Sequence, residues 1–471
     1  MYHSKNNKEM SKLYVFGIGG TGSRVLKALT MLLAAGVECK STIVPVIIDP
    51  DQDAADLTRA TELMKLYAQI REKNKFGDNE MFFKTEILRI VQNYRLPIDN
   101  TQTMKFKDFI GYNTLEDSDK ALCAALFSDK NLNSDMKVGF KGNPNIGSVV
   151  LNQFSNSANF KNIANSFQQD DKIFIVSSIF GGTGASGFPL LLKNLRTNDQ
   201  LSNHNLINNA KIGAISVLPY FSLKSESESE IDSSTFVSKT KSALGYYEKN
   251  ISDNNSLDAL YYIGDNITNA LENCEGGKDQ KNPAHLVELV AALAVLDFEK
   301  TDLPDIRQTQ HKEFGIKEDT TEVTFSHLSS ATNKNIKNRL VQMYLTIKYF
   351  DNAITEQVKY QPWAKSRKIT KSFMDSDYFQ LLKEFAAAFK EWLDEMGATQ
   401  RSFSPFNFTK NTKDVFETIN GVTPHKTRFG SFALIDHYLN GEPNDKQPIE
   451  EQFLRIFNNA TKQAVKQKIE N

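Results

Sequence analysis

Residues 13–23 read Leu-Tyr-Val-Phe-Gly-Ile-Gly-Gly-Thr-Gly-Ser, an apolar run that ends in a glycine-rich turn, and residues 25–33 continue with apolar helical periodicity. A second stretch of the same kind, residues 173–187, reads Ile-Phe-Ile-Val-Ser-Ser-Ile-Phe-Gly-Gly-Thr-Gly-Ala-Ser-Gly. Uninterrupted apolar runs are typical of strands buried on both faces of a parallel sheet. Each stretch therefore predicts a buried strand, a tight turn and a helix.

Glycine-rich turns of this kind suit phosphate groups. Glycine has no Cβ, so the backbone can come close to a ligand. A helix that begins in the turn presents unpaired N–H groups and the positive end of its dipole, which attract phosphate oxygens. The candidate phosphate-binding residues are Gly19, Gly20, Thr21, Gly22, Ser23, Gly181, Gly182, Thr183, Gly184, Ala185 and Ser186. A third turn-rich loop, Gly139–Gly147, lies between them in the sequence and contains Gly142 and Asn143.

The rest of the chain predicts an α/β fold followed by a helical region. Residues 41–49 form a second apolar run, which ends in the acidic cluster of Asp49, Asp51 and Asp53, and a strand, a helix and a strand at this spacing indicate a parallel crossover. Further strands are expected at 211–220 and 257–264, and a helix buried on all faces at 283–298. Beyond about residue 300 the periodicity is helical, apart from a short strand candidate at 323–325.

Composition limits the partners and the compartment. The 471 residues include 56 basic and 57 acidic ones, so whole-chain charge gives no sign of a nucleic-acid partner. The three cysteines are far apart and lack metal-ligand spacing, which favours a reducing environment. No apolar run reaches the ~20 residues of a membrane span, and the polar N-terminus does not resemble a secretory signal. We therefore expect a cytoplasmic protein without a membrane span.

The glycine turns allow several interpretations. Gly17-x-Gly-x-x-Gly22, with Asp49 after the next strand, has the spacing of a dinucleotide-binding fingerprint and would suit an oxidoreductase with a nicotinamide or flavin cofactor. That interpretation leaves the second turn without a role. A phosphate-loop NTPase is disfavoured because neither turn has the Gly-Lys-Ser/Thr ending. A purely structural role in strand-to-helix packing explains one turn more easily than three convergent loops.

The order of the loops resembles that of the tubulin/FtsZ superfamily, and is most similar to its divergent bacterial tubulin-like members. The matching segments, about residues 11 to 310, are Gly17–Ser23, Asp49–Gln52, Gly142–Gly147, Phe180–Gly187, Leu218–Phe221, Ile263–Asn266 and Asn282. The sequence departs from the family pattern at Phe180, where a glycine is usual, at Arg24, where FtsZ has Asn, and at Lys300.

This resemblance implies a tubulin-like nucleotide-binding domain at 11–280, a central helix with a catalytic-loop candidate at 281–310, and a mainly helical C-terminal domain at 311–471. It implies a GTP- or GDP-binding protein, a GTPase if active, that self-assembles. Mg²⁺ would be held by Asp49 or Asp51, the γ-phosphate would be sensed by Gly142 and Asn143, and the base side would be formed by Asn266 and Asn282.

The same resemblance assigns catalysis to Asp302 and Asp305, acting on the nucleotide of a neighbouring subunit. The alternative is a nucleotide-loaded scaffold or switch that does not polymerise and hydrolyses little. In either case the helical C-terminal region could bind a protein partner. No nucleic-acid partner is expected.

Overall fold

A six-stranded, all-parallel sheet forms the centre of the N-terminal part of the computed structural model. The structure describes residues 10–77, 81–153, 157–223, 236–266, 270–271, 276–305, 307–314, 316, 320–410, 412–444 and 447–470. The strands follow the spatial order β2-β1-β3-β4-β6-β8. Their bounds are β1 Lys12–Ile18, β2 Thr42–Ile48, β3 Lys172–Ser178, β4 Ile212–Val217, β6 Ala259–Ile263 and β8 Gln310–Glu313.

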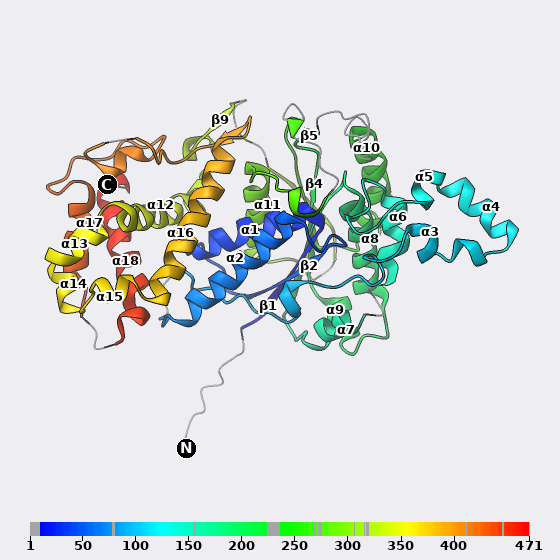
Figure 1. Ribbon diagram of the computed structural model, residues 1–471, viewed down its shortest axis with the longest axis horizontal. Helices are drawn as coiled ribbons and strands as arrows, with labels where there is room; N and C mark the ends of the chain where they lie inside the picture. Colours follow the sequence, from blue (N-terminus) through cyan, green and yellow to red (C-terminus); the bar gives the residue numbers. More distant parts are fainter. Residues whose placement is uncertain are drawn as a thin grey trace, which may run out of the picture.

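Helices cover both faces of this sheet (Figure 1). Leu13, Phe174 and Ile215 belong to the cluster that packs under α1 Gly19–Ala34, α2 Ala55–Glu72 and α11 Leu286–Lys300. Alternate residues, such as Phe16 and Ile175, face the other side. That side is covered by α6 Pro144–Leu151, α7 Ala158–Asn165, α8 Gly182–Thr197, α9 His204–Asn209 and α10 Phe236–Tyr247. The apolar runs are therefore buried on both faces, as the sequence predicts.

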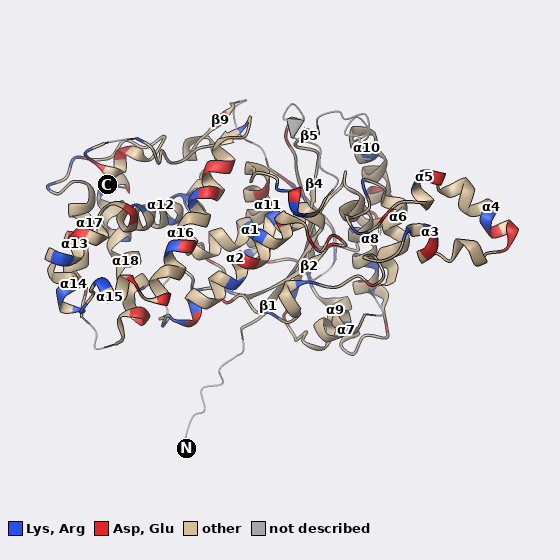
Figure 2. Ribbon diagram, viewed as in Figure 1, with Lys and Arg blue, Asp and Glu red and all other residues tan. Residues whose placement is uncertain are grey.

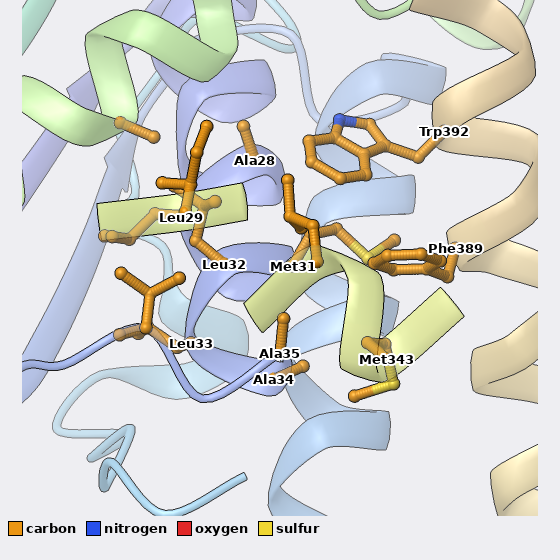
Figure 3. Packing of buried hydrophobic residues seen from close by; sticks show 14 of the residues in the cluster. Ala28, Leu29, Met31, Leu32, Leu33, Ala34, Ala35, Met343, Phe389 and Trp392 are labelled. Atoms are coloured by element: carbon orange, nitrogen blue, oxygen red, sulfur yellow. The ribbon is translucent and has the colours of Figure 1, made fainter. Parts of the chain in front are cut away.

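The C-terminal region is mainly helical and shares its core with the sheet. Its helices are α12 Ser330–Asn352, α13 Ile354–Tyr360, α14 Pro362–Ser366, α15 Lys371–Met374, α16 Asp377–Gly397, α17 Ser431–Gly441 and α18 Ile449–Val465. Met31 of α1 and Ala35, which caps the end of α1, lie beside Met343 of α12 and beside Phe389 and Trp392 of α16 (Figure 3). Because of this second apolar contact, almost every residue of α1 is buried.

Short elements complete the chain. An arm that projects from the sheet carries α3 Phe106–Phe109, α4 Asp117–Leu126 and α5 Asp129–Leu132 (Figure 1). Two-residue strands form two small parallel pairs, β5 Ser222–Leu223 with β7 Ala270–Leu271, and β9 Glu322–Val323 with β10 Ser402–Phe403. Within the described residues, no helix has the length and apolarity needed to cross a membrane.

The predicted α/β class, the parallel sheet, the central helix and the helical C-terminal region are confirmed. The predicted strands are one to three residues longer at their ends than the observed β4 and β6. The central helix begins at Leu286 and ends at Lys300, two to three residues later than predicted, because His285 caps its N-terminus through its ring. The sheet also gains β8, whose polar sequence Gln-His-Lys-Glu gives no apolar signal because it is an edge strand with alternate residues exposed.

Candidate functional site

The two glycine turns lie at the point where the strand order reverses. β1 and β3 are neighbours, yet β2 continues the sheet on one side and β4 on the other. In open parallel sheets, ligands bind outside the carboxyl ends of the strands at such a switch point. β1 ends at Ile18 and α1 begins at Gly19, while β3 ends at Ser178 and α8 begins at Gly182. A Cβ built on Gly19, whose φ is +70°, would lie 3.5 Å from Cβ of Thr183. The two helix N-termini are therefore adjacent.

The third loop lies against the second turn. Gly142 adopts a φ of +73°, and Asn143 precedes the first residue of α6. A Cβ built on Gly182 would lie 3.0 Å from the backbone nitrogen of Asn143 and 3.2 Å from that of Gly142. The structure thus brings all three glycine loops together at one edge of the sheet. It also places Lys239 of α10 there, where its Nζ donates to the carbonyl oxygen of Gly142 at 3.0 Å.

Several side chains of the turns are already engaged. Ser23 Oγ donates to the Gly19 carbonyl at 3.4 Å, and Ser186 Oγ donates to the Gly182 carbonyl at 2.6 Å. These hydroxyls support the first turn of each helix, so the groups that the turns have left for a ligand are mainly backbone N–H groups. Thr183 is half-buried beside Gly19, and the carbonyl oxygen of Ala185 accepts a 3.4 Å hydrogen bond from Tyr247. Gly184 lies tightly against Ser178, where a Cβ would approach its carbonyl oxygen to 2.5 Å.

The acidic loop after β2 lies at the same edge. Asp49 Oδ1 accepts from the backbone nitrogen of Asp51 at 3.0 Å. Both carboxylate oxygens of the buried Asp51 accept backbone N–H groups, from Asp53 at 3.1 Å and from Gly277 at 2.7 Å. Burial raises the pKa of Asp49 to about 7, and the hydrogen bond from Asp51 partly opposes that rise.

These carboxylates differ in their fitness for a cation. Mg²⁺ prefers oxygen ligands and keeps several waters, so one carboxylate beside a polyphosphate is sufficient. Asp49 retains an oxygen that no described hydrogen bond occupies, whereas both oxygens of Asp51 hold the loop together. Among the described residues, no group of three or more His, Cys, Asp or Glu side chains is arranged to hold a metal ion. Asp49 fits a cation that is shared with a ligand, and Asp51 fits the role of a loop anchor.

Arg24 forms the centre of a buried ionic network beside the first turn. Its Nε donates to Glu288 of α11 at 2.5 Å, its Nη1 to Asp56 of α2 at 2.7 Å, and its Nη2 to the Tyr220 hydroxyl at 2.8 Å. Burial alone would lower the pKa of the Arg24 guanidinium, but Tyr220, Glu288 and Asp56 raise it well above its ordinary value. Arg24 therefore stays charged and ties α1 to α2 and α11.

Asn282 is part of the same network. Its Nδ2 donates to Asp56 Oδ2 at 3.0 Å, and its backbone nitrogen donates to Asp56 Oδ1 at 3.1 Å. An ionised carboxylate only accepts, so the amide nitrogen must face Asp56 and the side-chain carbonyl oxygen of Asn282 faces away from it. The cavity between Asn282, Arg24 and Tyr220 measures only about 10 Å³, which is room for a single water. A ligand would therefore meet the half-buried Asn282 from the solvent side.

The C-terminal region reaches these loops through α16 and the segment after it. Glu395 accepts from the backbone nitrogen of Ala284 at 3.0 Å. Arg401 Nε donates to both carboxylate oxygens of Asp265, at 2.7 and 2.9 Å. Asn266 follows Asp265 and is exposed at the carboxyl end of β6, two strands away from β3. The structure thus places Asn266 at the same edge of the sheet as the glycine turns.

Asp302 and Asp305 lie at the opposite edge of the sheet. They follow α11, whose 15 residues span about 22 Å from the edge that carries Arg24 and Asn282. Lys172, the first residue of β3, donates to the Glu299 carbonyl at 2.9 Å, and Lys211, just before β4, donates to the Pro304 carbonyl. Both aspartates are exposed. They do not join the glycine loops of their own chain, so contact with a glycine-loop edge requires a second molecule.

The sequence did not identify Lys239, Asp56 or Glu288 as part of this site, and it included Tyr220 only through the matching segment Leu218–Phe221. Asp56 closely follows the acidic cluster of Asp49, Asp51 and Asp53, and no motif in the sequence pairs it with Arg24. A usable signal was present for Glu288, because an acidic residue inside an otherwise apolar, fully buried helical segment requires a buried partner. Arg24, inside the apolar pattern of α1, gives the matching signal.

Comparison with solved structures finds weak similarity to tubulin-like proteins. An FtsZ dimer from M. jannaschii is 15% identical, with a TM-score of 0.29 over 62% of this chain and 54% of that chain. A CetZ from Methanosaeta thermophila is 15% identical, with a TM-score of 0.27 over 54% of this chain and 46% of that chain. CetZ2 from Haloferax volcanii, in a GTPγS-bound protofilament, is 14% identical, with a TM-score of 0.29 over 62% and 60% of the two chains.

This chain therefore spans roughly half of the length of each of these structures. No protein-family model matches the sequence. No curated protein matches it either.

Proposed function

We propose that this protein binds a guanine nucleotide in a tubulin/FtsZ-like manner and hydrolyses it when a neighbouring subunit completes the site. The observation that carries the proposal is the convergence of two helix N-termini and a third glycine loop at the switch point of a parallel sheet. Two adjacent helix N-termini concentrate unpaired N–H groups and two positive dipole ends on one ligand. Such an arrangement suits a di- or triphosphate better than a single phosphate.

Each loop has a distinct role in this proposal. Backbone N–H groups of residues 19–23 and 181–186 hold the α- and β-phosphates, while Gly142 and Asn143 lie where a γ-phosphate would end. Lys239, which bonds the Gly142 carbonyl, adds a positive charge beside that end. A Mg²⁺ ion held by Asp49 and the phosphates would neutralise charge on the oxygens. Phosphoryl transfer needs positioning and charge neutralisation more than covalent help, and these groups supply both.

The network around Asn282 favours guanine over adenine. Asp56 takes one of the two amide N–H donors of Asn282 and holds the amide nitrogen toward itself, so the side-chain carbonyl oxygen points to the side from which a base would approach. Guanine presents an N–H at ring position 1, which that oxygen can accept, whereas adenine presents an acceptor there. Asn282→Ala should therefore reduce the preference for GTP over ATP about tenfold, measured by competition against a fluorescent nucleotide. Equal loss of affinity for both nucleotides would contradict this role.

The position of Asp302 and Asp305 supports catalysis between subunits. They lie across the sheet from the glycine loops, so a head-to-tail contact would bring them to a neighbour's γ-phosphate, where a carboxylate can orient water. Asp302→Ala and Asp305→Ala should each lower GTP turnover about 100-fold while nucleotide binding persists, and wild-type turnover per molecule should rise with protein concentration. Turnover that is independent of concentration and unchanged in both variants would argue against this role.

A second candidate function follows from the same geometry. If subunits do not associate through these edges, no described carboxylate of the 302–305 segment reaches the nucleotide, and the protein is a nucleotide-loaded scaffold or switch. The contacts of Glu395 and Arg401 with the loops at 284 and 265 would then carry the nucleotide state to the helical region. Light scattering with GTP separates the candidates, because nucleotide-dependent polymer supports the first and bound nucleotide without assembly supports the second.

Gly20 offers the sharpest test of binding itself. A Cβ at Gly20 meets nothing within 4 Å except Nη1 of Arg24, at 3.5 Å, so a side chain there enters open space at the N-terminus of α1. Gly20→Asp places a carboxylate where phosphate should bind and should lower nucleotide affinity at least about 100-fold. Gly20→Ala is the matched control and should retain binding. The nucleotide that co-purifies, released by denaturation and identified by chromatography, checks the ligand directly; a nicotinamide or flavin would instead favour the dinucleotide interpretation.

A further inference from the structure

The arm that carries α3, α4 and α5 ends in an unusual exposed helix. None of the residues of α4 is buried, and Leu122 and Leu126, one turn apart, are 59% and 58% exposed. Ala125, three positions after Leu122, adjoins these leucines on the helix surface and is also exposed. Phe106 and Phe127 fix the base of the arm through an edge-on ring contact at 4.9 Å. The arm therefore presents a firmly attached apolar stripe to solvent.

The N-terminal turn of α4 adds negative charge next to this stripe. Glu116, Asp117 and Asp119 are exposed, and within the described part of the chain none of their carboxylates has an ion-pair partner. Lys120 is the basic residue of this helix, so α4 as a whole is acidic and amphipathic. Contiguous exposed apolar residues with a polar border commonly mark protein–protein contacts.

A groove at the other end of the molecule has a basic border, opposite in charge to α4. The groove measures about 780 Å³ and lies among α13, α15, α16 and the end of α12. Its floor is apolar and is formed by Phe350, Ile354, Val358, Ile369, Met374 and Phe379. Its border is basic and is formed by Lys359, Lys365, Lys368, Lys371 and Lys383, with Asp375 as the acidic residue of the lining. An apolar groove of this kind is where the apolar face of an amphipathic helix docks.

The lysines of this border are available for a partner. Lys365, Lys368 and Lys371 are exposed, and none of them has an ion-pair partner among the described residues. Lys359 pairs with Glu356, and Lys383 lies over the ring of Phe379. Figure 2 shows acidic residues at the outer end of the arm and basic residues on α13, α14 and α15 at the other end of the molecule. The arm and the groove are thus complementary in both apolar character and charge.

We propose that α4 of one molecule docks into the lysine-bordered groove of a second copy of this chain. Leu122 and Leu126 would lie on the apolar floor, and Glu116, Asp117 and Asp119 would face the lysines. The arm and the groove lie at opposite ends of the longest dimension of the molecule, so a chain cannot fill its own groove (Figure 1). A contact between two different surfaces that does not close on itself produces open chains of molecules.

This contact differs from the association proposed for catalysis. That association would bring Asp302 and Asp305 of one molecule to the glycine loops of the next. It requires no nucleotide and goes beyond the proposed function. One short helix in one groove buries a small interface, so the expected affinity is weak, with a Kd of about 10 to 100 µM at low salt. Because charge pairs border the contact, association should weaken as the salt concentration rises.

The test uses the full chain without nucleotide and with a chelator, followed by sedimentation velocity over a concentration series. The wild type should form concentration-dependent oligomers. The arm variant Leu122→Asp/Leu126→Asp and the groove variant Lys368→Glu/Lys371→Glu should each weaken association at least about tenfold. Val237→Asp, another exposed apolar position at 42% exposure, is the matched control and should associate like the wild type. Unchanged circular dichroism would show that each variant is folded.

Two mixing experiments then determine which surfaces meet. An equimolar mixture of the arm and groove variants leaves one intact arm and one intact groove per pair, so it should stop at a dimer. The charge exchange Asp117→Lys/Asp119→Lys combined with Lys368→Glu/Lys371→Glu in one chain should recover association that either pair alone removes. A wild type that stays monomeric, variants that associate like the wild type, or a charge exchange that fails to recover association would each overturn the proposal. Failure of nucleotide binding would not affect this result.

Discussion

The two glycine turns share a strand–turn–helix plan but differ in what surrounds them. The first turn is closed by its own glycines, because a Cβ on Gly22 would lie 2.4 Å from the carbonyl carbon of Gly17. It is followed by the charged network of Arg24. The second turn has aromatic surroundings, since the Phe180 ring packs against Phe221 and Phe236, with centroids 5.6 and 5.1 Å apart. The same glycine motif therefore lies beside buried charged side chains in the first turn and beside aromatic rings in the second.

This difference suggests a division of labour within the site. The first turn ties three helices together through charge and stands next to Asn282, on the side proposed for the base. The second turn supports the loop that contains Gly142 and Asn143, on the side proposed for the γ-phosphate. Gly22→Ala in the first turn should therefore affect folding more than Gly182→Ala in the second, and Gly182→Ala should affect mainly the ligand.

The largest effect is expected at Arg24. Arg24→Met leaves Glu288 and Asp56 buried without their cation, and the loss of one partner of a buried ion pair costs about 3 to 5 kcal/mol of unfolding free energy. Urea denaturation measures this loss. The double variant Arg24→Met/Glu288→Gln should recover part of it, because the second change removes one uncompensated charge. A loss below about 1 kcal/mol for Arg24→Met would show that the network is not structural.

The second-largest loss of unfolding free energy is expected at Gly22. Gly22→Ala forces a Cβ into the backbone of Gly17, which cannot move without displacing β1, and should cost about 3 kcal/mol of unfolding free energy. Gly20→Ala, two residues earlier in the same turn, is the matched control and should be neutral or slightly stabilising, because its Cβ has room and alanine favours the helix. Equal stability of the two variants would contradict the packing role assigned to Gly22.

The glycine loops could be predicted from the sequence because their physical requirements are local. Buried strands give apolar runs, and a turn that brings the backbone close to neighbouring groups requires glycine at fixed positions. The partners of Arg24 could not be predicted, because Asp56, Tyr220 and Glu288 come from three distant segments and only tertiary packing brings them together. The hydrogen bond from the Asn282 amide to Asp56 could not be predicted for the same reason.

Elements at the periphery of the molecule were even harder to predict from the sequence. β8 is an edge strand with a polar sequence, so neither an apolar run nor a strong alternation identifies it. The arm and the groove were not predicted because exposed apolar residues at helical spacing, such as Leu122 and Leu126, look like core residues in a sequence. Only the structure shows that the face they form is left uncovered within the described molecule.

A smaller, pH-dependent effect is expected at Asp49. Its pKa is raised to about 7 in the folded chain, above the ~3.9 of an unfolded aspartate, so the folded state binds this proton more tightly. The contribution of the Asp49 carboxyl group to the unfolding free energy is therefore largest below about pH 4, where it is protonated in both states, and is lost as the pH rises through 7. The full shift corresponds to about 4 kcal/mol at pH 8, and solvent reduces it because the Asp49 side chain is partly exposed. Asp49→Asn should therefore raise the unfolding free energy by about 2 kcal/mol at pH 8 and by about half as much at pH 5.5, in chelator and without nucleotide. The exposed Asp53→Asn serves as the control, and a gain that does not depend on pH would contradict the assignment.

The smallest effect on stability, and the most informative about the ligand, is expected at Gly182. Gly182→Ala brings a Cβ to within 3.0 to 3.2 Å of Asn143, Phe140 and Gly142, which is tight enough to shift the third loop by a few tenths of an ångström but not to prevent folding. We expect a loss of about 1 kcal/mol in unfolding free energy.

If the third loop senses a γ-phosphate, the variant should lose affinity for GTP more than for GDP, because GDP does not reach that loop. Titration calorimetry with both nucleotides measures the difference. Equal losses of affinity for GTP and GDP would place the third loop away from the γ-phosphate and would give both turns the same phosphate-binding role. A loss of unfolding free energy as large as that of Gly22→Ala would remove the contrast between the two turns.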